Sequence, residues 1–155
     1  MEDFTPEIER KLKMYPSPEK ILPHRPPLLL LDEVLEVSDD KVVATRTFRA
    51  DEEFFKGHFP GEPIVPGVYL VEAMAQAMAY GELYNHGPHR MLLTGVNKAK
   101  FRVPVLPGET VTFSLELLGP KMNMYRAKGV ATVNGKKVAE ADLSGIFQST
   151  ESGEE

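Results

Sequence analysis

Residues 66–84 constrain the fold more than any other segment, because they have the pattern of a long helix that cannot face water. The segment PGVYLVEAMAQAMAYGELY is apolar around almost its whole circumference until Glu82. A helix of this kind is buried on most of its sides. At about 1.5 Å per residue it would be roughly 28 Å long, enough to run the length of a small sheet. The rest of the chain must therefore form a layer that wraps around it.

The segments on both sides of this helix have the patterns of β-strands. TVTFSLEL (110–117) alternates apolar and polar residues, with the period of a strand that has one dry face and one wet face. Asn134-Gly135 is a strong hairpin signal, and short connections of this kind favour antiparallel pairing. We predict an α+β fold in which one antiparallel sheet curls around the central helix. The predicted strands are residues 28–37, 41–49, 91–105, 110–117, 129–133 and 136–143.

The length and composition suit a single globular domain over residues 1–155. The chain has 155 residues, of which 42% are hydrophobic, so it can bury a sizeable core. We expect residues 1–20 to form an N-terminal extension that includes a helix starting at Thr5-Pro6 and ending before Pro16. The polar, acidic residues 149–155 are expected to be a disordered tail.

Charge, hydropathy and cysteine content exclude several classes of protein. The formal net charge is −5, so the chain lacks the basic excess with which proteins engage nucleic-acid phosphates. No apolar run approaches the roughly 18 residues of a membrane span, and the start MEDFTPEIER is too acidic for a signal peptide. There is no cysteine, hence no disulfide and no cysteine zinc site, and a reducing, cytoplasmic location is expected.

The candidate catalytic groups lie in KGHFPGEPIVPGVYLVE (56–72). Prolines and glycines forbid regular structure between His58 and the helix, so they form a stiff loop that can hold the imidazole with little mobility. Glu72 is a lone carboxylate within the apolar helix. Burial without a cation would raise its pKa and favour the protonated form that a general acid needs. Two alternative interpretations are open: His58 is a packed or surface residue, and Glu72 is a structural glutamate that is hydrogen-bonded to Gln76 or to the backbone.

The start of the predicted helix adds a third candidate group. Pro66 has no N–H to leave unpaired, whereas Gly67 and Val68 offer free backbone N–H groups at the positive end of the helix dipole. A carbonyl oxygen that gains negative charge could be held there. A base, an acid and an anion hole together suit removal of a proton next to a carbonyl with loss of a neighbouring hydroxyl, which is a β-elimination of water. An ordinary helix start that donates to water is the other interpretation.

The run GHFPGEPIVPGVYLVEAMAQ (57–76) resembles the signature of the (3R)-hydroxyacyl-[acyl-carrier-protein] dehydratases of bacterial type II fatty acid synthesis. The resemblance covers about residues 21–148 and includes ILPHRPPLLLLDEV, GVNKAKFRVPVLPGE and ATVNGKKVAEADL. It implies the hot-dog fold, a curled antiparallel sheet around one long helix. It also implies dehydration of a (3R)-3-hydroxyacyl thioester to the trans-2-enoyl thioester in fatty acid biosynthesis, without a metal or redox cofactor. The substrate would be carried on the phosphopantetheine arm of acyl carrier protein.

The resemblance assigns roles to residues at matching positions. His58 would be the catalytic histidine, Glu72 the catalytic acid, and Gly67, with Val68, the place where the thioester carbonyl is held. The family works as homodimers, commonly three together, in which each active site takes its histidine from one protomer and its acid from the other. Glutamate at position 72 resembles the simple dehydratases, whereas the isomerising branch usually has aspartate. The candidates for the substrate tunnel are Phe59, Tyr69 and Gln76.

Two segments depart from the family pattern and leave the chain-length preference and the tunnel shape open. The early motif HRPPL (24–28) lacks the usual aromatic residues, and KMNMYRAKG (121–129) lacks the usual glycine-bearing run. His24 is expected to be a turn residue. Met74 and Met78 are expected in the core, where they could also line a flexible tunnel. The pair His86 and His89 has no third ligand nearby, so no metal site is expected.

A basic stripe is predicted on the strand that follows the helix. Lys98, Lys100 and Arg102 alternate, so all three would point to one face. They could dock an acidic carrier protein and its phosphate, or they could be a solvated face that discourages edge pairing. Arg126 and Lys128 are the second candidate dock. A hot-dog thioesterase that uses Glu72 to activate water and a non-catalytic acyl-thioester binding protein are the alternative functions.

Overall fold

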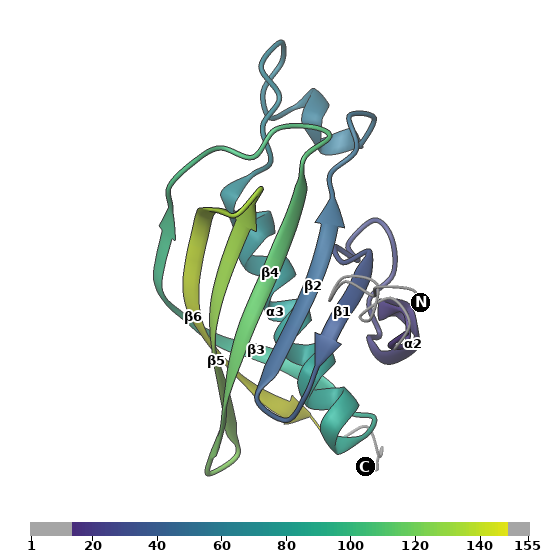
Figure 1. Ribbon diagram of the computed structural model, residues 1–155, viewed down its shortest axis with the longest axis vertical. Helices are drawn as coiled ribbons and strands as arrows, with labels where there is room; N and C mark the ends of the chain where they lie inside the picture. The colour runs from purple at the N-terminus through teal and green to yellow at the C-terminus, as the bar shows by residue number, and fades with distance from the viewer. Residues whose placement is uncertain (1–13, 149–155) are drawn as a thin grey trace, which may run out of the picture.

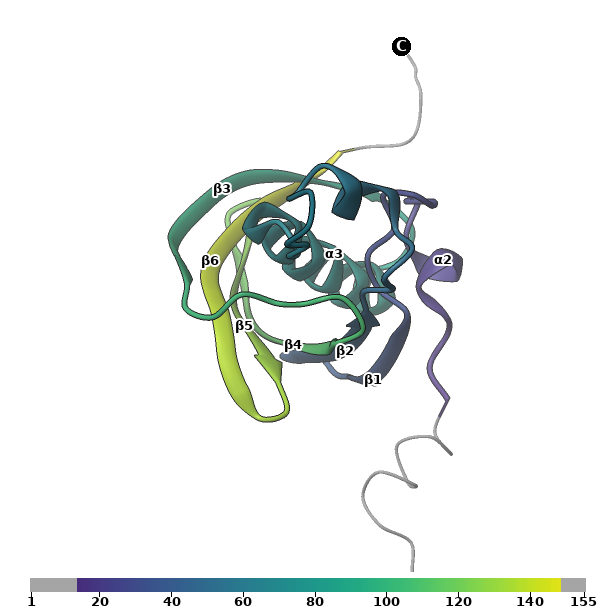
Figure 2. The same cartoon turned by 90° about the horizontal axis from the view of Figure 1, so that it is seen from above.

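In the computed structural model, residues 14–148 are described; the helix expected from Thr5 and the tail 149–155 lie outside them. One long helix, α3 (Gly67–His86), packs against the concave side of a six-stranded sheet. Seen from above, the sheet curls around α3 without closing (Figure 2). The predicted α+β architecture with a curled sheet around a central helix is therefore confirmed, and α3 extends two residues beyond the predicted end at Tyr84.

Every pair of neighbouring strands in the sheet is antiparallel. The strand order is β1-β2-β4-β5-β6-β3, so β1 and β3 are the two free edges (Figure 1). Asn134 and Gly135 form the hairpin between β5 and β6, with φ angles of 51° and 80° that suit a tight two-residue turn. The strands are β1 (Glu33–Val37), β2 (Lys41–Thr47), β3 (Arg90–Phe101), β4 (Thr110–Lys121), β5 (Met124–Val133) and β6 (Lys136–Gln148).

The predicted strand over residues 28–37 is only half right, because Leu28 and Leu30 bond to the helix instead of to the sheet. The side chain of Gln76 accepts a hydrogen bond from Leu30 N–H and donates one to the Leu28 carbonyl oxygen, both at 2.8 Å. These bonds satisfy backbone groups that a strand partner would otherwise have taken. As a result β1 begins at Glu33, and the segment before it lies along α3.

Two short helical segments complete the described chain. α2 (Pro18–Ile21) precedes β1, and the 3₁₀ turn η1 (Glu53–Lys56) follows β2. η1 lies at the same end of the molecule as the start of α3 (Figure 1). The core lies between α3 and the sheet, and its largest fully buried apolar side chains include Tyr80, Phe48, Phe113, Met74 and Met78.

The sheet and α3 approach each other closely at Gly81. A Cβ on Gly81 would lie 2.3 Å from Val42 Cγ2 on β2 and 3.0 Å from Leu117 Cδ1 on β4. Only glycine permits this approach of the helix backbone to the sheet.

Candidate active site

His58 is held by a network of backbone bonds in the loop between η1 and α3. Its N–H donates to Phe54 O at 3.1 Å, and its carbonyl accepts from Ile64 N–H at 3.0 Å. The ring atom Nδ1 lies 3.1 Å from the Ile64 carbonyl oxygen, which can only accept. In the neutral imidazole, Nδ1 therefore carries the proton and Nε2 keeps its lone pair. The stiff loop thus presents a half-buried imidazole whose free nitrogen can accept a proton.

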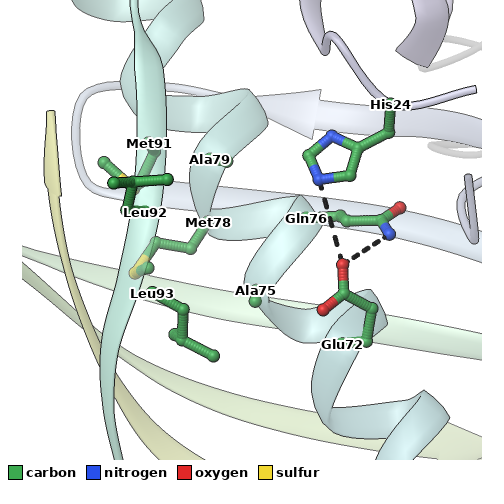
Figure 3. Close-up of a pocket in the computed structure, with 9 residues that line it drawn as sticks. All are labelled: His24, Glu72, Ala75, Gln76, Met78, Ala79, Met91, Leu92 and Leu93. Carbon is green, nitrogen blue, oxygen red and sulfur yellow. Dashed lines mark hydrogen bonds and ion pairs between the residues drawn. The ribbon is translucent and has the colours of Figure 1, made fainter. Parts of the chain in front are cut away.

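Glu72 projects from the second turn of α3 into a cavity of about 130 Å³ (Figure 3). Gln76 Nε2 donates to Glu72 Oε2 at 2.9 Å, and Gln76 is itself buried and fixed to residues 28 and 30. The expectation that Glu72 is fully buried is wrong for a single chain, since its side chain is 33% exposed. The apolar part of the cavity wall comes from α3 and β3 and consists of Ala75, Met78, Ala79, Met91, Leu92 and Leu93.

His24 also lines this cavity, although its sequence context suggested only a turn. His24 Nε2 lies 3.9 Å from Glu72 Oε2, and its Nδ1 is buried with no partner in the described part of the chain (Figure 3). The available signal was the motif PHRPP, because prolines on both sides of a histidine restrict it as they restrict His58. That motif could not show that residue 24 approaches residue 72, since this contact depends on how residues 28–30 pack along α3.

The start of α3 has free backbone donors, as expected. Pro66 is the N-cap, and Tyr69 N–H already donates to Pro66 O at 2.9 Å. Within the described residues no acceptor is recorded for the N–H groups of Gly67 and Val68. A Cβ on Gly67 would lie 2.9 Å from the ring of Phe101, so the end of β3 reaches over the helix start. Because Gly67 has no Cβ, the ring can approach the helix start, where the two N–H groups lie at the positive end of the helix dipole.

The structure does not bring His58 and Glu72 into one cavity within a single chain. The residues that line the cavity around Glu72 do not include His58. Phe59 stacks on the His58 ring with centroids 3.9 Å apart and is largely exposed. Tyr69 packs against Phe54, with centroids 4.8 Å apart, and lines a separate groove of about 560 Å³. Of the three tunnel candidates, only Gln76 lies beside Glu72.

The basic stripe differs from the predicted one. The register of β3 against β6 shifts between Asn97 and Lys100, and Lys98 has a φ of 55°. This bulge interrupts the strict alternation on which a common face for Lys98 and Lys100 depended. Arg102 follows the end of β3 and forms an ion pair with Glu140, which Lys137 also contacts at 3.1 Å.

The contacts of Arg102 and Lys137 with Glu140 still bring basic side chains together near the end of β3. The hydrogen bonds from Arg102 and Lys137 lower the pKa of Glu140, so it stays ionised and neutralises part of the cluster. Lys98, Lys100 and Lys137 are all exposed, and they lie near the strand end that covers Gly67. We call Lys98, Lys100, Arg102 and Lys137 the basic cluster.

Two buried groups on α3 have shifted pKa values outside the candidate site. Burial raises the pKa of Glu82 to about 7, and its Oε1 lies 3.4 Å from His86 Nε2. Burial also raises the pKa of Tyr80, whose hydroxyl donates to Pro16 O at 2.6 Å.

His89 stacks on Phe147 at a centroid distance of 4.9 Å. In residues 14–148, no group of three or more potential metal ligands occurs, and no helix is long and apolar enough to cross a membrane.

Known proteins are similar to this chain in both sequence and structure. The 3-hydroxyacyl-[acyl-carrier-protein] dehydratase FabZ of Petrotoga mobilis is 44% identical over 125 residues, which are 80% of this chain and 90% of that protein. The protein of the same name from Enterococcus faecalis is 46% identical over 129 residues, 81% of this chain and 92% of that protein.

Solved structures share the fold at lower identity. The dehydratase heterocomplex ApeI:P from Xenorhabdus doucetiae aligns with a TM-score of 0.78 and 21% identity, over 88% of this chain and 94% of that one. A hypothetical thioesterase with coenzyme A from Streptococcus pneumoniae aligns with a TM-score of 0.60 and 13% identity, over 77% of this chain and 88% of that one. These similarities confirm the hot-dog fold.

The family comparison covers most of the chain. The model of the FabA-like domain matches residues 22–142, which include the loop of His58, the whole of α3 and the basic cluster. Together with relatives that are more than 40% identical over most of their length, this match is sufficient to assign the family. The chain belongs to the FabA-like family.

Proposed function

We propose that this protein dehydrates (3R)-3-hydroxyacyl thioesters carried on acyl carrier protein and releases the trans-2-enoyl thioester, a step of fatty acid biosynthesis. Its relatives in Petrotoga mobilis and Enterococcus faecalis are named for this reaction. The observation that carries the proposal is the hydrogen bond between His58 Nδ1 and the Ile64 carbonyl. It leaves Nε2 as a proton acceptor in a loop that cannot easily move.

His58 Nε2 removes the proton from the carbon next to the thioester carbonyl. The electron pair of that C–H bond forms the new double bond, and the bond to the neighbouring hydroxyl breaks. Charge that develops on the carbonyl oxygen is stabilised by the N–H groups of Gly67 and Val68, which lie at the positive end of α3. No metal or redox cofactor is needed, since two proton transfers balance the reaction.

Glu72 protonates the departing hydroxyl, directly or through a water molecule, so that the leaving group is water. Gln76 holds the carboxyl at 2.9 Å and is itself bonded to the backbone on its other side. The carboxyl thus has a defined position on the wall of the cavity, and the acyl chain occupies the apolar part of that cavity. The proton that His58 gains returns to Glu72 before the next cycle, which restores both groups.

The active site is shared between two copies of the chain. Within one chain His58 does not line the cavity of Glu72, so a second protomer has to supply the base. β3 is a free sheet edge that exposes Leu92, Leu93 and Val96. A free apolar edge favours pairing with a second sheet. Edge-to-edge pairing of β3 in a homodimer would also cover the exposed start of α3, where Val68 is 69% exposed. Three such dimers can associate further.

The basic cluster docks the carrier protein. Its residues lie beside the helix start at which the thioester is held, because Phe101, within the same segment, contacts Gly67. A phosphopantetheine arm that enters there passes exposed lysine side chains on its way to Gly67. Positive charge at this place favours an acidic carrier protein, although the net charge of the chain is −5.

The shared site can be tested with His58→Ala and Glu72→Gln. Each variant alone should lose about 10²–10⁴-fold in turnover, the usual contribution of a positioned acid or base. When the two variants are produced together in equal amounts, half of the dimers are mixed, and each mixed dimer regains one intact site. Turnover should then recover to about one quarter of the wild-type value. The product formed from a hydroxyacyl thioester is also identified, and we expect the enoyl thioester.

Each outcome has a distinct meaning. If the mixture stays as inactive as the single variants, each chain forms its own site and the shared arrangement is wrong. If His58→Ala keeps activity within a few-fold of wild type, His58 is not the base. Release of a free acid instead of an enoyl thioester would indicate a thioesterase, and an unchanged substrate would indicate a binding protein.

A further inference from the structure

Arg46 on β2 is a buried cation that takes no part in the reaction described above. Its side chain is 8% exposed, and its guanidinium binds two carboxylates. Nη1 lies 3.1 Å from Asp32 Oδ1, and Nη2 lies 2.5 Å from Glu52 Oε1. A buried charge is costly unless it is paired, so the positions of both carboxylates are tied to that of Arg46.

Glu52 connects this buried pair to the segment that carries His58. It is the N-cap of η1, and its Oε2 accepts a hydrogen bond from Arg49 N–H at 2.7 Å. Its carbonyl accepts from Phe55 N–H at 3.2 Å, which starts the turn. At the end of the same turn, Phe54 O accepts from the N–H groups of Gly57 and His58, both at 3.1 Å. One side chain and one helical turn therefore separate Arg46 from the backbone of His58.

Aromatic packing holds the same turn from the other side. The ring of Phe54 lies edge-on to Phe48 at 6.2 Å and to Tyr69 at 4.8 Å. The guanidinium of Arg46 lies 5.2 Å from the Phe48 ring centroid. η1 is thus fixed between the sheet and the start of α3, and among residues 14–148 only the Glu52 carboxylate gives it a charged anchor in the sheet.

We propose that Arg46 and Glu52 form a positioning pair, which sets the place of His58 by anchoring η1 to the sheet. The proposal rests on the proposed role of His58 as the base. Neither residue touches the substrate. Their effect is on the distance between His58 Nε2 and the proton that it removes, and a displacement of about 1 Å at a reacting group can cost about 10²-fold in rate.

Asp32 provides a matched control, because it binds the other terminal nitrogen of the same guanidinium. Its second oxygen, Oδ2, accepts from Thr47 N–H at 2.7 Å, which ties it to β2. Asp32 immediately precedes β1 and has no recorded bond, among residues 14–148, to η1 or to the loop of His58. Glu52→Gln and Asp32→Asn therefore each remove one negative charge from Arg46, but only the first loosens the anchor of η1.

The experiment compares Glu52→Gln with Asp32→Asn in the full-length protein. Three kinds of measurement are made: steady-state kinetics on a small thioester, which give kcat and KM, the imidazole NMR signals of the histidines, and the melting temperature. We expect Glu52→Gln to lower kcat by about 10-fold to 10²-fold with KM changed by less than about threefold. The His58 signal, identified by its loss in His58→Ala, should shift or broaden. Asp32→Asn should lose a similar amount of thermal stability yet keep kcat and the His58 signal.

The proposal is overturned if Glu52→Gln keeps kcat and an unchanged His58 signal, or if both variants lose kcat in proportion to their loss of stability. If Glu52→Gln does not fold, Arg46→Lys replaces it, because lysine keeps the charge but lacks the planar fork that binds two carboxylates. The same criteria then apply. A failure of the base assignment is recognised separately: His58→Ala would stay active, while the NMR comparison would still report whether Glu52 sets the position of His58.

Discussion

Glu72 and Glu82 are carboxylates on the same helix in different surroundings. Glu82 is 2% exposed, and burial raises its pKa to about 7, whereas Glu72 opens into a cavity and is only half-buried. The carboxyl whose pKa burial raises therefore has no proposed catalytic part. Glu72 is distinguished instead by its position beside a cavity, by Gln76 and by His24.

The raised pKa of Glu82 makes the stability of the fold depend on pH. Between about pH 4.5 and 7 the folded state holds a proton that the unfolded state has lost, so stability falls as pH rises and levels off above 7. Glu82→Gln removes this titration. The unfolding free energy of the variant minus that of wild type should therefore be larger at pH 8 than at pH 4.5, by on the order of 2–3 kcal/mol.

Denaturant unfolding at both pH values, with wild type measured alongside, checks this prediction. Glu116→Gln is the control, because Glu116 is exposed on β4 and should show no pH-dependent gain. If the unfolding free energies of wild type and Glu82→Gln differ by the same amount at both pH values, the pKa of Glu82 is not raised in the folded protein.

At the scale of elements, α3 is buried on all sides but one. Val68, Glu72 and Ala75 lie one helical turn apart, and none of them is fully buried in a single chain. The opposite side packs so closely on the sheet that only glycine fits at position 81. The helix therefore has one face for the sheet and one for the cavity, which the second protomer would cover in the dimer that we propose.

Gly81→Ala tests the close contact between α3 and the sheet. Alanine favours a helix by about 1 kcal/mol over glycine. However, its Cβ would lie 2.3 Å from Val42 Cγ2, and the valine side chain is stiff, so overpacking of about 1–3 kcal/mol should outweigh that gain. We expect a lower melting temperature. Gly57→Ala is the control, because its nearest neighbour would be a backbone oxygen at 3.9 Å; a stabilised Gly81→Ala would show that the helix can shift.

β3 shows why an element can be predicted while the direction of its side chains cannot. The strand forms near the expected residues, but bulges shift its register between Leu93 and Gly95 and between Asn97 and Lys100. A single inserted residue reverses the face of every side chain beyond it. The prediction of the strand was therefore correct, whereas the prediction that Lys98 and Lys100 share one face was not, because of the bulge at Lys98.

At the scale of the whole molecule, the sheet is open and β3 is one of its free edges (Figure 1). The start of this strand lines the cavity of Glu72, and its other end carries Lys98 and Lys100 of the basic cluster. Within one chain the cavity lacks the proposed base, His58, and the apolar edge is free. Both features support the homodimer that we propose.

Reversing the charge of Lys98, Lys100 and Arg102 to Glu tests the carrier dock. Attraction between exposed charges is screened over about 8 Å at physiological ionic strength, so it mainly steers association. The triple variant should have a strongly raised KM for carrier-bound substrate at low salt and a smaller rise at high salt. A small thioester without the carrier should be converted almost as before.

A second triple variant, with Lys41, Lys121 and Lys128 changed to Glu, alters the net charge equally at β2, β4 and β5. It should leave KM for the carrier-bound substrate nearly unchanged. If KM for the carrier-bound substrate rises more in this second variant than in the first, the dock lies near Arg126 and Lys128 instead. If the first variant loses equal activity on the carrier-bound substrate and on the small thioester, the change has damaged the active site itself.

Local patterns in the sequence were sufficient for much of this protein. The apolar circumference of residues 66–84, the alternation in 110–117 and the Asn134-Gly135 turn specify a helix, a half-buried strand and a hairpin, because each depends on neighbours within a few residues. The motif around His58 also indicated the family, since its prolines and glycines act on the local backbone. These features therefore determined the fold class and the candidate base.

Other features depend on contacts between distant residues, and only the tertiary structure decided them. Gln76 draws residues 28–30 away from the sheet, which brings His24 beside Glu72 across 48 positions of the sequence. Burial of Glu82, the bulge at Lys98 and the anchor between Arg46 and Glu52 likewise follow from how the sheet, helix and loops pack. Packing is a property of the whole chain, so no local pattern encodes which of several similar side chains will be enclosed, exposed or paired.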